Sequence, residues 1–284
     1  MKPNVSNADL LYVSNSNAEV TVYRYWQHTL VGVLTDFTKP MGECVDAAQN
    51  VYIADYSAQQ IVEYAHGGSK PIKEIDDAPD SPYACAVDPS SGNLAVANDD
   101  GASQQGNIAI WNASGQRTNY TDAKLDNFQG CAYDENGALL VTNGYVQYPY
   151  QTYFAWLPKG GSKLVDVSIP NGYNDNWGDV FGIQWDGKYF AIDTPERIYR
   201  IMLSHAQAYY IGYTGFAYSD EYSTGPYALY VKPGSEGTQA VEGLDAFSGS
   251  GLVAYWQYPT GGNAIGALKH GIDKPFGVAI SLKK

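Results

Sequence analysis

The sequence predicts an all-β protein, a six-bladed β-propeller with four antiparallel strands in each blade. Short apolar runs rich in Val, Ile, Tyr and Ala are separated by turns of Gly, Asn and Asp, which is the pattern of many short strands. A segment with Pro-x-Gly, an apolar strand and Asp, first seen at Pro40–Asp46, returns in variant form at intervals of roughly 40–50 residues, the period of propeller blades. No stretch has the 3.6-residue periodicity of a helix.

The strands follow in a fixed order around these six anchor segments. Residues 1–8 form a polar tail, and Leu10–Ser14, Val20–Tyr25 and Leu30–Leu34 precede the first anchor. Three strands follow each of the first five anchors: VYIAD, QIVEY and PIKEI; NLAVAN, NIAIWN and an edge near Thr118–Tyr120; ALLVTN, YFAWL and KLVDV; KYFAID, RIYRIML and AYYIGY; and TQAVEG, LVAYWQY and AIGAL.

The last anchor, which ends at Ser281, has no followers, and the first three strands have no anchor. We therefore expect the C-terminal strand to pair with the N-terminal three and to close the ring without an exposed edge. Residues 1–284 then form a single domain. The alternative all-β arrangement is a sandwich of irregular hairpins.

The stretch PMGECVDAAQNVYIADYSAQQIVEY resembles an NHL-type repeat, and SPYACAVDPSSGNLAVAN matches that pattern almost as well. The resemblance covers the whole chain and extends to the wider group of six-bladed propellers that includes gluconolactonase-like hydrolases and streptogramin lyases. These motifs report the fold and not the chemistry.

Composition limits the partners. The chain carries 30 acidic and 17 basic groups and a net charge of −13. Nucleic acid and anionic membranes need basic patches, so neither is expected as a partner. No apolar run reaches the roughly 18–20 residues of a membrane helix. Cations, neutral sugars and aromatic molecules fit this Tyr-rich chain better, although acidity also serves solubility alone.

Few Lys and Arg and many Asn, Thr, Ser, Tyr and Gly favour an exported protein, periplasmic or extracellular, with its leader absent from this chain. The start of the chain also fits a native cytosolic terminus. The three Cys cannot all pair with one another. We expect a monomer.

The default ligand site of a propeller is the funnel at the face where the innermost strands begin. Five of the six loops that join second and third strands open with Asn or Asp. Their oxygens suit a hard cation such as Ca²⁺ or Mg²⁺, although no cofactor is certain, or they suit sugar hydroxyls. Asx turns explain the same residues without a ligand. The metal candidates are Asp55, Asn98, Asn143, Asp193 and, as a loose match to the N-terminal Glu of gluconolactonase-like enzymes, Glu43.

Aromatic side chains are expected at the mouth of this funnel. The position before the Gly or Ala of each anchor is mostly aromatic, and Trp177 and an insertion containing Tyr148 and Tyr150 could cover the opening. Such rings suit sugars or flat organic ligands, or they cap the spaces between blades. The six anchor positions are Met41, Tyr83, Gln129, Phe181, Tyr227 and Phe276.

Glu43, Cys85 and Cys131 share the position that directly follows the anchor Gly or Ala. Packing between blades predicts buried, inert thiols there, and a soft metal site is the alternative. His270 lies in a loop on the funnel side together with Asp273. It is the candidate general base, with Asp273 beside it.

Two functions follow. The first is a non-catalytic propeller that binds a small neutral or aromatic ligand, or a protein, in the funnel. The alternative is a lactonase-like or streptogramin-lyase-like hydrolase or lyase with a divalent ion on the Asn/Asp ring, which would activate water or polarise a carbonyl.

Overall fold

The structure of the protein is a computed structural model. It describes residues 1–2, 5–25, 27–99, 105–143, 152–168, 180, 182–194, 197–217, 226–231, 239–244 and 251–283, with the side chains of 226–231 and 239–244 left aside. Apart from one 3₁₀ turn, η1 (Val5–Asn7), the elements within these ranges are strands, as the sequence predicts.

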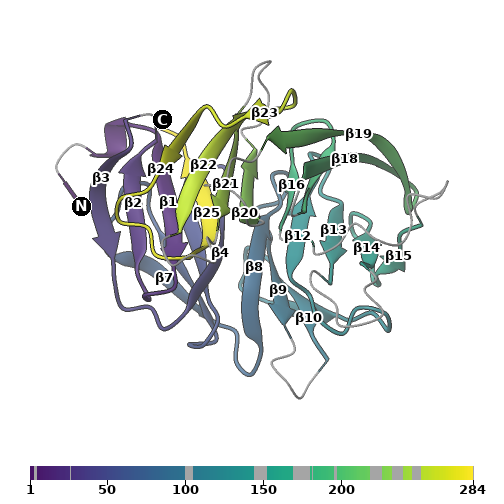
Figure 1. The fold of residues 1–284 in the computed structure, drawn as a ribbon. Helices are drawn as coiled ribbons and strands as arrows, with labels where there is room; N and C mark the ends of the chain where they lie inside the picture. Colours follow the sequence, from purple (N-terminus) through teal and green to yellow (C-terminus); the bar gives the residue numbers. More distant parts are fainter. Residues whose placement is uncertain are drawn as a thin grey trace.

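The described strands form six antiparallel-paired sheets, five of them with four strands (Figure 1). Two sheets hold the N-terminal part of the chain together with its last strand. They are β25 (Pro275–Ser281), β1 (Leu10–Asn15), β2 (Val20–Arg24) and β3 (Thr29–Leu34), and β4 (Pro40–Val45), β5 (Val51–Asp55), β6 (Gln60–Tyr64) and β7 (Pro71–Asp76).

The next two sheets run in chain order from their innermost strand outward. They are β8 (Ser81–Val87), β9 (Leu94–Asp99), β10 (Asn107–Trp111) and β11 (Arg117–Tyr120), and β12 (Gly130–Tyr133), β13 (Leu139–Thr142), β14 (Phe154–Leu157) and β15 (Val165–Asp166).

The last two sheets share one irregular connection, because β23 (Gly262–Asn263) pairs in parallel with the outermost strand of its neighbour. They are β16 (Gly182–Trp185), β17 (Phe190–Thr194), β18 (Arg197–Ser204) and β19 (Gln207–Ala217) with β23, and β20 (Pro226–Val231), β21 (Gln239–Leu244), β22 (Leu252–Gln257) and β24 (Gly266–Leu268).

The first strand of each sheet is also its inner strand. Contacts link β25 to β4, β4 to β8, β8 to β12, β12 to β16, β16 to β20, and β20 back to β25. β25 pairs with β1 over Leu10–Asn15, as predicted for the C-terminal strand. Neighbouring inner strands therefore lie side by side at the propeller axis, and each is hydrogen-bonded to the second strand of its own sheet.

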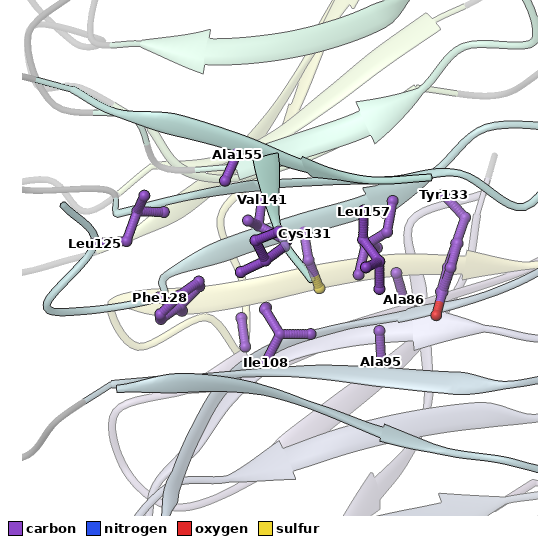
Figure 2. Packing of buried hydrophobic residues seen from close by; sticks show 13 residues of the cluster. Ala86, Ala95, Ile108, Leu125, Phe128, Cys131, Tyr133, Val141, Ala155 and Leu157 are labelled. Atoms are coloured by element: carbon purple, nitrogen blue, oxygen red, sulfur yellow. The ribbon is translucent and has the colours of Figure 1, made fainter. Parts of the chain in front are cut away.

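The hydrophobic core lies in the spaces between neighbouring sheets. Figure 2 shows one of these spaces, where Ala86 and Ile108 of one sheet face Cys131, Val141 and their neighbours on the next. Each strand alternates its side chains between the two faces of its sheet, so one sheet supplies residues to two such spaces. The core therefore consists of several such spaces between neighbouring sheets, which we call seams, and not of one central cluster.

The Asp that ends the anchors is structural. The carboxylate of Asp46 accepts hydrogen bonds from the backbone and side-chain nitrogens of Asn50. Asp134 and Asp186 accept backbone N–H groups of the turn that follows them. These are Asx turns that hold the hairpin between the first two strands of a blade.

The N-terminal segment differs from the predicted polar tail. Val5 is buried between sheets, and the backbone N–H of Lys2 donates to the carbonyl of Val31 at 2.7 Å. The predicted edge near Thr118–Tyr120 is present as β11. β19 is longer than the predicted AYYIGY and reaches Ala217.

Candidate functional site

The axis of the propeller is narrow where the inner strands begin. A Cβ on Gly42 would lie 2.8 Å from the carbonyl oxygen of Tyr83, and one on Gly277 would lie 2.1 Å from that of Met41. Real Cβ atoms essentially never approach another heavy atom this closely, so only glycine fits at these two positions. The anchor glycines therefore let β25, β4 and β8 approach backbone to backbone.

Beyond this constriction the axis widens into a cavity of about 540 Å³. Consecutive residues of β4, β8, β12, β16 and β25 line it, because the strand edge without a sheet partner faces the axis. The apolar part of the wall includes Val45, Val87, Ile183, Val278, Ile280 and Leu282, and two aromatic residues, Tyr133 and Trp185, complete it. The cavity lies toward the end of the inner strands, the face we call the C-terminal face.

A much smaller cavity of about 60 Å³ lies at the opposite, N-terminal face. Three predicted mouth residues, Tyr83, Gln129 and Phe276, line it. These three side chains border the same space on the axis, and that space is small. The larger cavity lies at the C-terminal face, and backbone contact among β25, β4 and β8 narrows the axis between the two cavities on that side.

The remaining predicted mouth residues do not contribute to the described walls. Met41 is buried in the seam between β4 and β8, with 3% of its surface exposed. The others lie outside the residues whose side chains the structure describes: Phe181, Tyr227, Trp177, Tyr148 and Tyr150.

The Asn and Asp residues proposed as metal ligands make local contacts at the ends of second strands. The carboxylate of Asp55 is fully buried and accepts the backbone N–H groups of Thr38 and Lys39 at 3.0 and 2.8 Å. The side-chain oxygen of Asn143 accepts the N–H of Tyr153 at 2.8 Å. Both contacts tie a loop to a strand end, which is the structural alternative to a metal site.

Asn98 and Asp193 are also fully buried. Asn98 donates its side-chain amide to the side-chain oxygen of Asn107 at 3.2 Å. Burial raises the pKa of Asp193 well above its ordinary value. Neither residue lines the described part of either cavity. Within the described ranges no three His, Cys, Asp or Glu side chains gather closely enough to hold a metal ion.

Glu43 is the metal candidate that does line the axis, and it lines both cavities. Its Oε1 accepts the hydroxyl of Ser14 at 2.7 Å, and its Oε2 is buried without a hydrogen-bond partner. Burial raises its pKa from 4.5 to about 8, while hydrogen bonds from Ser14 and the backbone of Ala279 act in the opposite direction. Glu43 is therefore a protonated acid at neutral pH.

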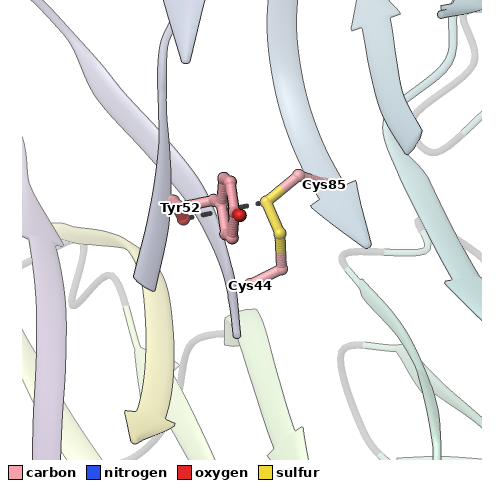
Figure 3. The surroundings of a disulfide bond; sticks show 3 residues. All are labelled: Cys44, Tyr52 and Cys85. Carbon is pink, nitrogen blue, oxygen red and sulfur yellow. Dashed lines mark hydrogen bonds between the residues drawn. A yellow bond between two sulfur atoms is a disulfide. The ribbon is translucent and has the colours of Figure 1, made fainter. Parts of the chain in front are cut away.

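The expectation that Cys85 is a free thiol is wrong. Cys85 forms a disulfide with Cys44, with the two Cα atoms 5.6 Å apart, and the bond joins the inner strands β4 and β8 (Figure 3). The sulfur of Cys85 also lies 3.7 Å from the carbonyl oxygen of Tyr52. The side chain of Cys85 points toward the preceding blade. Its partner there is Cys44, which directly follows Glu43, the residue that occupies the repeat position of Cys85 in that blade.

Cys131 is the buried thiol that the sequence predicts. Its sulfur lies between two sheets (Figure 2), and burial raises its pKa to about 12. Because the thiolate is the reactive form, this residue is inert near neutral pH. Glu43, Cys85 and Cys131 do share one position on successive blades, but each points into a different seam, so they do not form a common metal site.

His270 and Asp273 do not form an acid–base pair with each other in the described contacts. His270 is exposed, and its backbone carbonyl accepts the hydroxyl of Tyr23. The Asp273 carboxylate accepts the hydroxyl of Ser16 at 3.0 Å, and its N–H donates to Asn15 at 2.9 Å. Asp273 thus holds the loop that leads into β25 against the loop after β1.

Sequence reasoning missed the residues of the large cavity. Asp46, Glu135 and Gln49 line it at the C-terminal face together with Tyr133 and Trp185. Tyr133 and Trp185 are aromatic at the same anchor position, directly before the Asp that closes the anchor. That repeated position was the available signal.

Antiparallel four-stranded sheets around an axial cavity define the protein as a β-propeller. A chain of a nidogen–laminin complex superposes with a TM-score of 0.73 at 17% identity, covering 97% of this chain and 99% of that one. Hydrazine synthase from Kuenenia stuttgartiensis gives 0.67 at 16% identity, covering 88% and 81%. At such identities the likeness shows the fold alone.

No protein-family model matches the sequence, and no curated protein matches it either. No helix among the described residues is long and apolar enough to cross a membrane.

Proposed function

We propose that this protein is a non-catalytic binding propeller that holds a small, largely apolar or aromatic molecule in the cavity at its C-terminal face. The observation that carries the proposal is the cavity itself. Its volume of about 540 Å³ lies in the range of small-molecule sites. The predicted ligand class is retained, while its location moves from the N-terminal to the C-terminal face.

The wall supports a ligand with a flat or alicyclic apolar body and a few polar groups. Aliphatic side chains and two aromatic rings offer dispersion contacts, and strand edges offer backbone donors and acceptors. Trp185 adds an indole N–H that is buried without a hydrogen-bond partner. A ligand acceptor that reached this group would satisfy it.

A protein partner at one face is a second possibility within the same proposal, and the nidogen–laminin structure gives it some support because that fold takes part in a protein complex. The alternative, a metal-assisted hydrolase or lyase, rests on the sequence resemblance to gluconolactonase-like and streptogramin-lyase-like propellers. Hydrazine synthase illustrates that the fold also occurs in an enzyme.

For the architecture we propose six blades in a closed ring, with NHL-like repeats. The six sheets, the pairing of β25 with β1 and the contacts that lead around the inner strands support this. For the compartment we propose an exported protein that acts as a monomer. The disulfide supports an oxidising environment, where such bonds persist.

A ligand screen tests the proposed site. Small aromatic molecules and sugars are screened by ligand-observed NMR, and hits are measured against Val87→Trp and Val45→Trp, which fill the large cavity. We expect both variants to lose binding by more than about tenfold while they keep a native circular dichroism spectrum. Tyr83→Ala, in the small cavity, is the matched control and is expected to retain binding.

Two results would count against the proposal. Binding that is lost in Tyr83→Ala but kept in both Trp variants would place the ligand at the N-terminal face. A screen without any hit removes the small-molecule function. Metal analysis and a melting curve in chelator test the alternative, which predicts a bound divalent ion and a lower melting temperature in chelator.

A further inference from the structure

The described wall of the large cavity has acidic side chains and no basic ones. Asp46, Glu135 and Glu43 line it, Glu43 as a protonated acid at neutral pH, and the described lining residues include no Lys, Arg or His. Asp46 and Glu135 follow β4 and β12, which are separated by β8, so carboxylates approach the cavity from two sides. An anion would meet repulsion on entering, whereas a cation would meet attraction.

The turn contacts of Asp46 do not remove its charge. Its two oxygens accept hydrogen bonds from Asn50, and the Tyr52 side chain also hydrogen-bonds to it. Neither partner carries a positive charge. No salt bridge to Asp46 or Glu135 occurs among the described residues. Both carboxylates therefore lie beside the cavity without a basic partner among the described residues. Asp46 is half-buried and Glu135 is exposed, so water screens the effect of Glu135 on a bound ligand more strongly.

The aromatic part of the wall favours the same ligand. Tyr133 and Trp185 belong to neighbouring inner strands, β12 and β16, and both line the cavity. Aromatic faces attract cations, and quaternary or substituted ammonium groups gain most because they are weakly hydrated. The aliphatic residues around these rings would contact the apolar remainder of such a molecule.

We propose that the large cavity selects organic cations: amines or quaternary ammonium compounds whose charged group lies among Tyr133, Trp185 and the carboxylates of Asp46 and Glu135. This inference rests on the proposed function and narrows its ligand class. The net charge of −13 supports it at longer range, because it attracts cations toward the protein. Lys232, which corresponds to Asp46 in the fifth repeat, lies outside the described residues.

A pair of ligands that differ only in charge tests the inference. The 4-hydroxyphenyltrimethylammonium ion and 4-tert-butylphenol have nearly the same shape, and their dissociation constants are measured by titration calorimetry on the intact protein. We expect the cation to bind at least about tenfold more tightly, with the preference reduced at high salt.

Charge-neutralising variants locate the effect. Asp46→Asn keeps an oxygen that can accept the N–H of Asn50, and Glu135→Gln keeps the side-chain length. Each is expected to weaken the cation by about two- to fivefold and to leave 4-tert-butylphenol within twofold. Glu74→Gln, on the exposed strand β7, removes the same charge away from the cavity and is expected to change neither ligand.

The possible outcomes distinguish failure of the cation preference from failure of the proposed small-molecule binding. Equal or tighter binding of the phenol overturns the cation preference and leaves a neutral-ligand site. If neither compound binds but the screen finds another molecule that the Val87→Trp variant excludes, the cation preference is again overturned while the site remains. If nothing binds in the cavity, the proposed function fails as well.

Discussion

Two neighbouring seams of this propeller have the same geometry and different chemistry. In the seam between β4 and β8, Cys44 of one inner strand meets Cys85 of the next, and the two are covalently joined. In the seam between β8 and β12, the corresponding residues are Ala86 and Cys131, which pack together in a hydrophobic cluster. One seam is fixed by a bond and the other by burial of apolar surface.

The difference shows that the repeat determines where side chains meet between two blades. The residue types at those positions determine how the two blades are held together. The residue after the anchor glycine points toward the preceding blade, and the next residue points toward the following blade. At the seam between β25 and β4 this places the carboxyl of Glu43 against the backbone of Ala279. At the seam between β12 and β16 it places Ile183 in one cluster with Ala132.

The largest effect is expected from breaking the covalent seam. The double variant Cys44→Ala and Cys85→Ala should lose about 3 kcal/mol of the free energy of unfolding, because the bond closes a long loop of the unfolded chain. Urea unfolding without reductant measures this loss. Cys131→Ala, in the packed seam, should lose only about 1 kcal/mol. Similar losses in both would show that the bond adds nothing to packing.

The seam between β25 and β4 contains the carboxyl group of Glu43, which should make the free energy of unfolding depend on pH. Glu43 keeps its proton to about pH 8 in the folded protein, whereas its ordinary pKa is 4.5. Its contribution is therefore complete below pH 4.5 and declines as pH rises through 8. Relative to Glu43→Gln, the wild type should lose about 2 kcal/mol between pH 5 and 9, after a discount for water in the axial cavity.

Unfolding curves of both proteins across this pH range measure that difference, with Glu74→Gln as the control for removing an exposed carboxylate. Parallel profiles for wild type and Glu43→Gln would show that Glu43 titrates normally in the folded state.

The smallest effect comes from converting the packed seam into a covalent one. Ala86→Cys would place a second thiol beside Cys131, in the same relation that Cys44 has to Cys85, so that a disulfide could form between β8 and β12. We expect the free thiol of the wild type to disappear and stability to rise by up to about 2 kcal/mol under oxidising conditions. Thiol titration of the unfolded protein gives the first result and urea unfolding the second. Two titratable thiols in the variant would mean that the two seams differ in geometry.

The architecture was predictable from the sequence because its signals are local and repeated. Short strands, Asx turns at the anchor Asp and glycines such as Gly42 recur at the blade period, and each repetition reinforces the same interpretation. The pairing of the C-terminal strand with the first sheet also followed, from an anchor strand without followers. The burial of Val5 was missed because a lone apolar residue in a polar segment carries no periodic signal.

The site was less predictable because its location depends on distances between strands that are remote in sequence. Tyr83 and Phe276 border a small cavity on the axis, and the backbone contact at Gly277 lies beside it. The disulfide was missed for a similar reason: Cys44 and Cys85 differ by one position in the repeat, and only the relation between adjacent blades shows that this offset brings them together.

The backbone contacts at Gly42 and Gly277 also determine whether a ligand can pass along the axis. Along β25, β4 and β8 the passage between the two axial cavities is bounded by main chain, and side-chain rotation cannot widen it. On this side of the axis, opening would require whole blades to separate, and the Cys44–Cys85 bond opposes that for one pair. On this side the large cavity is therefore closed at its inner end. A bound ligand must enter and leave through the C-terminal face, so contacts at that face determine its dissociation rate.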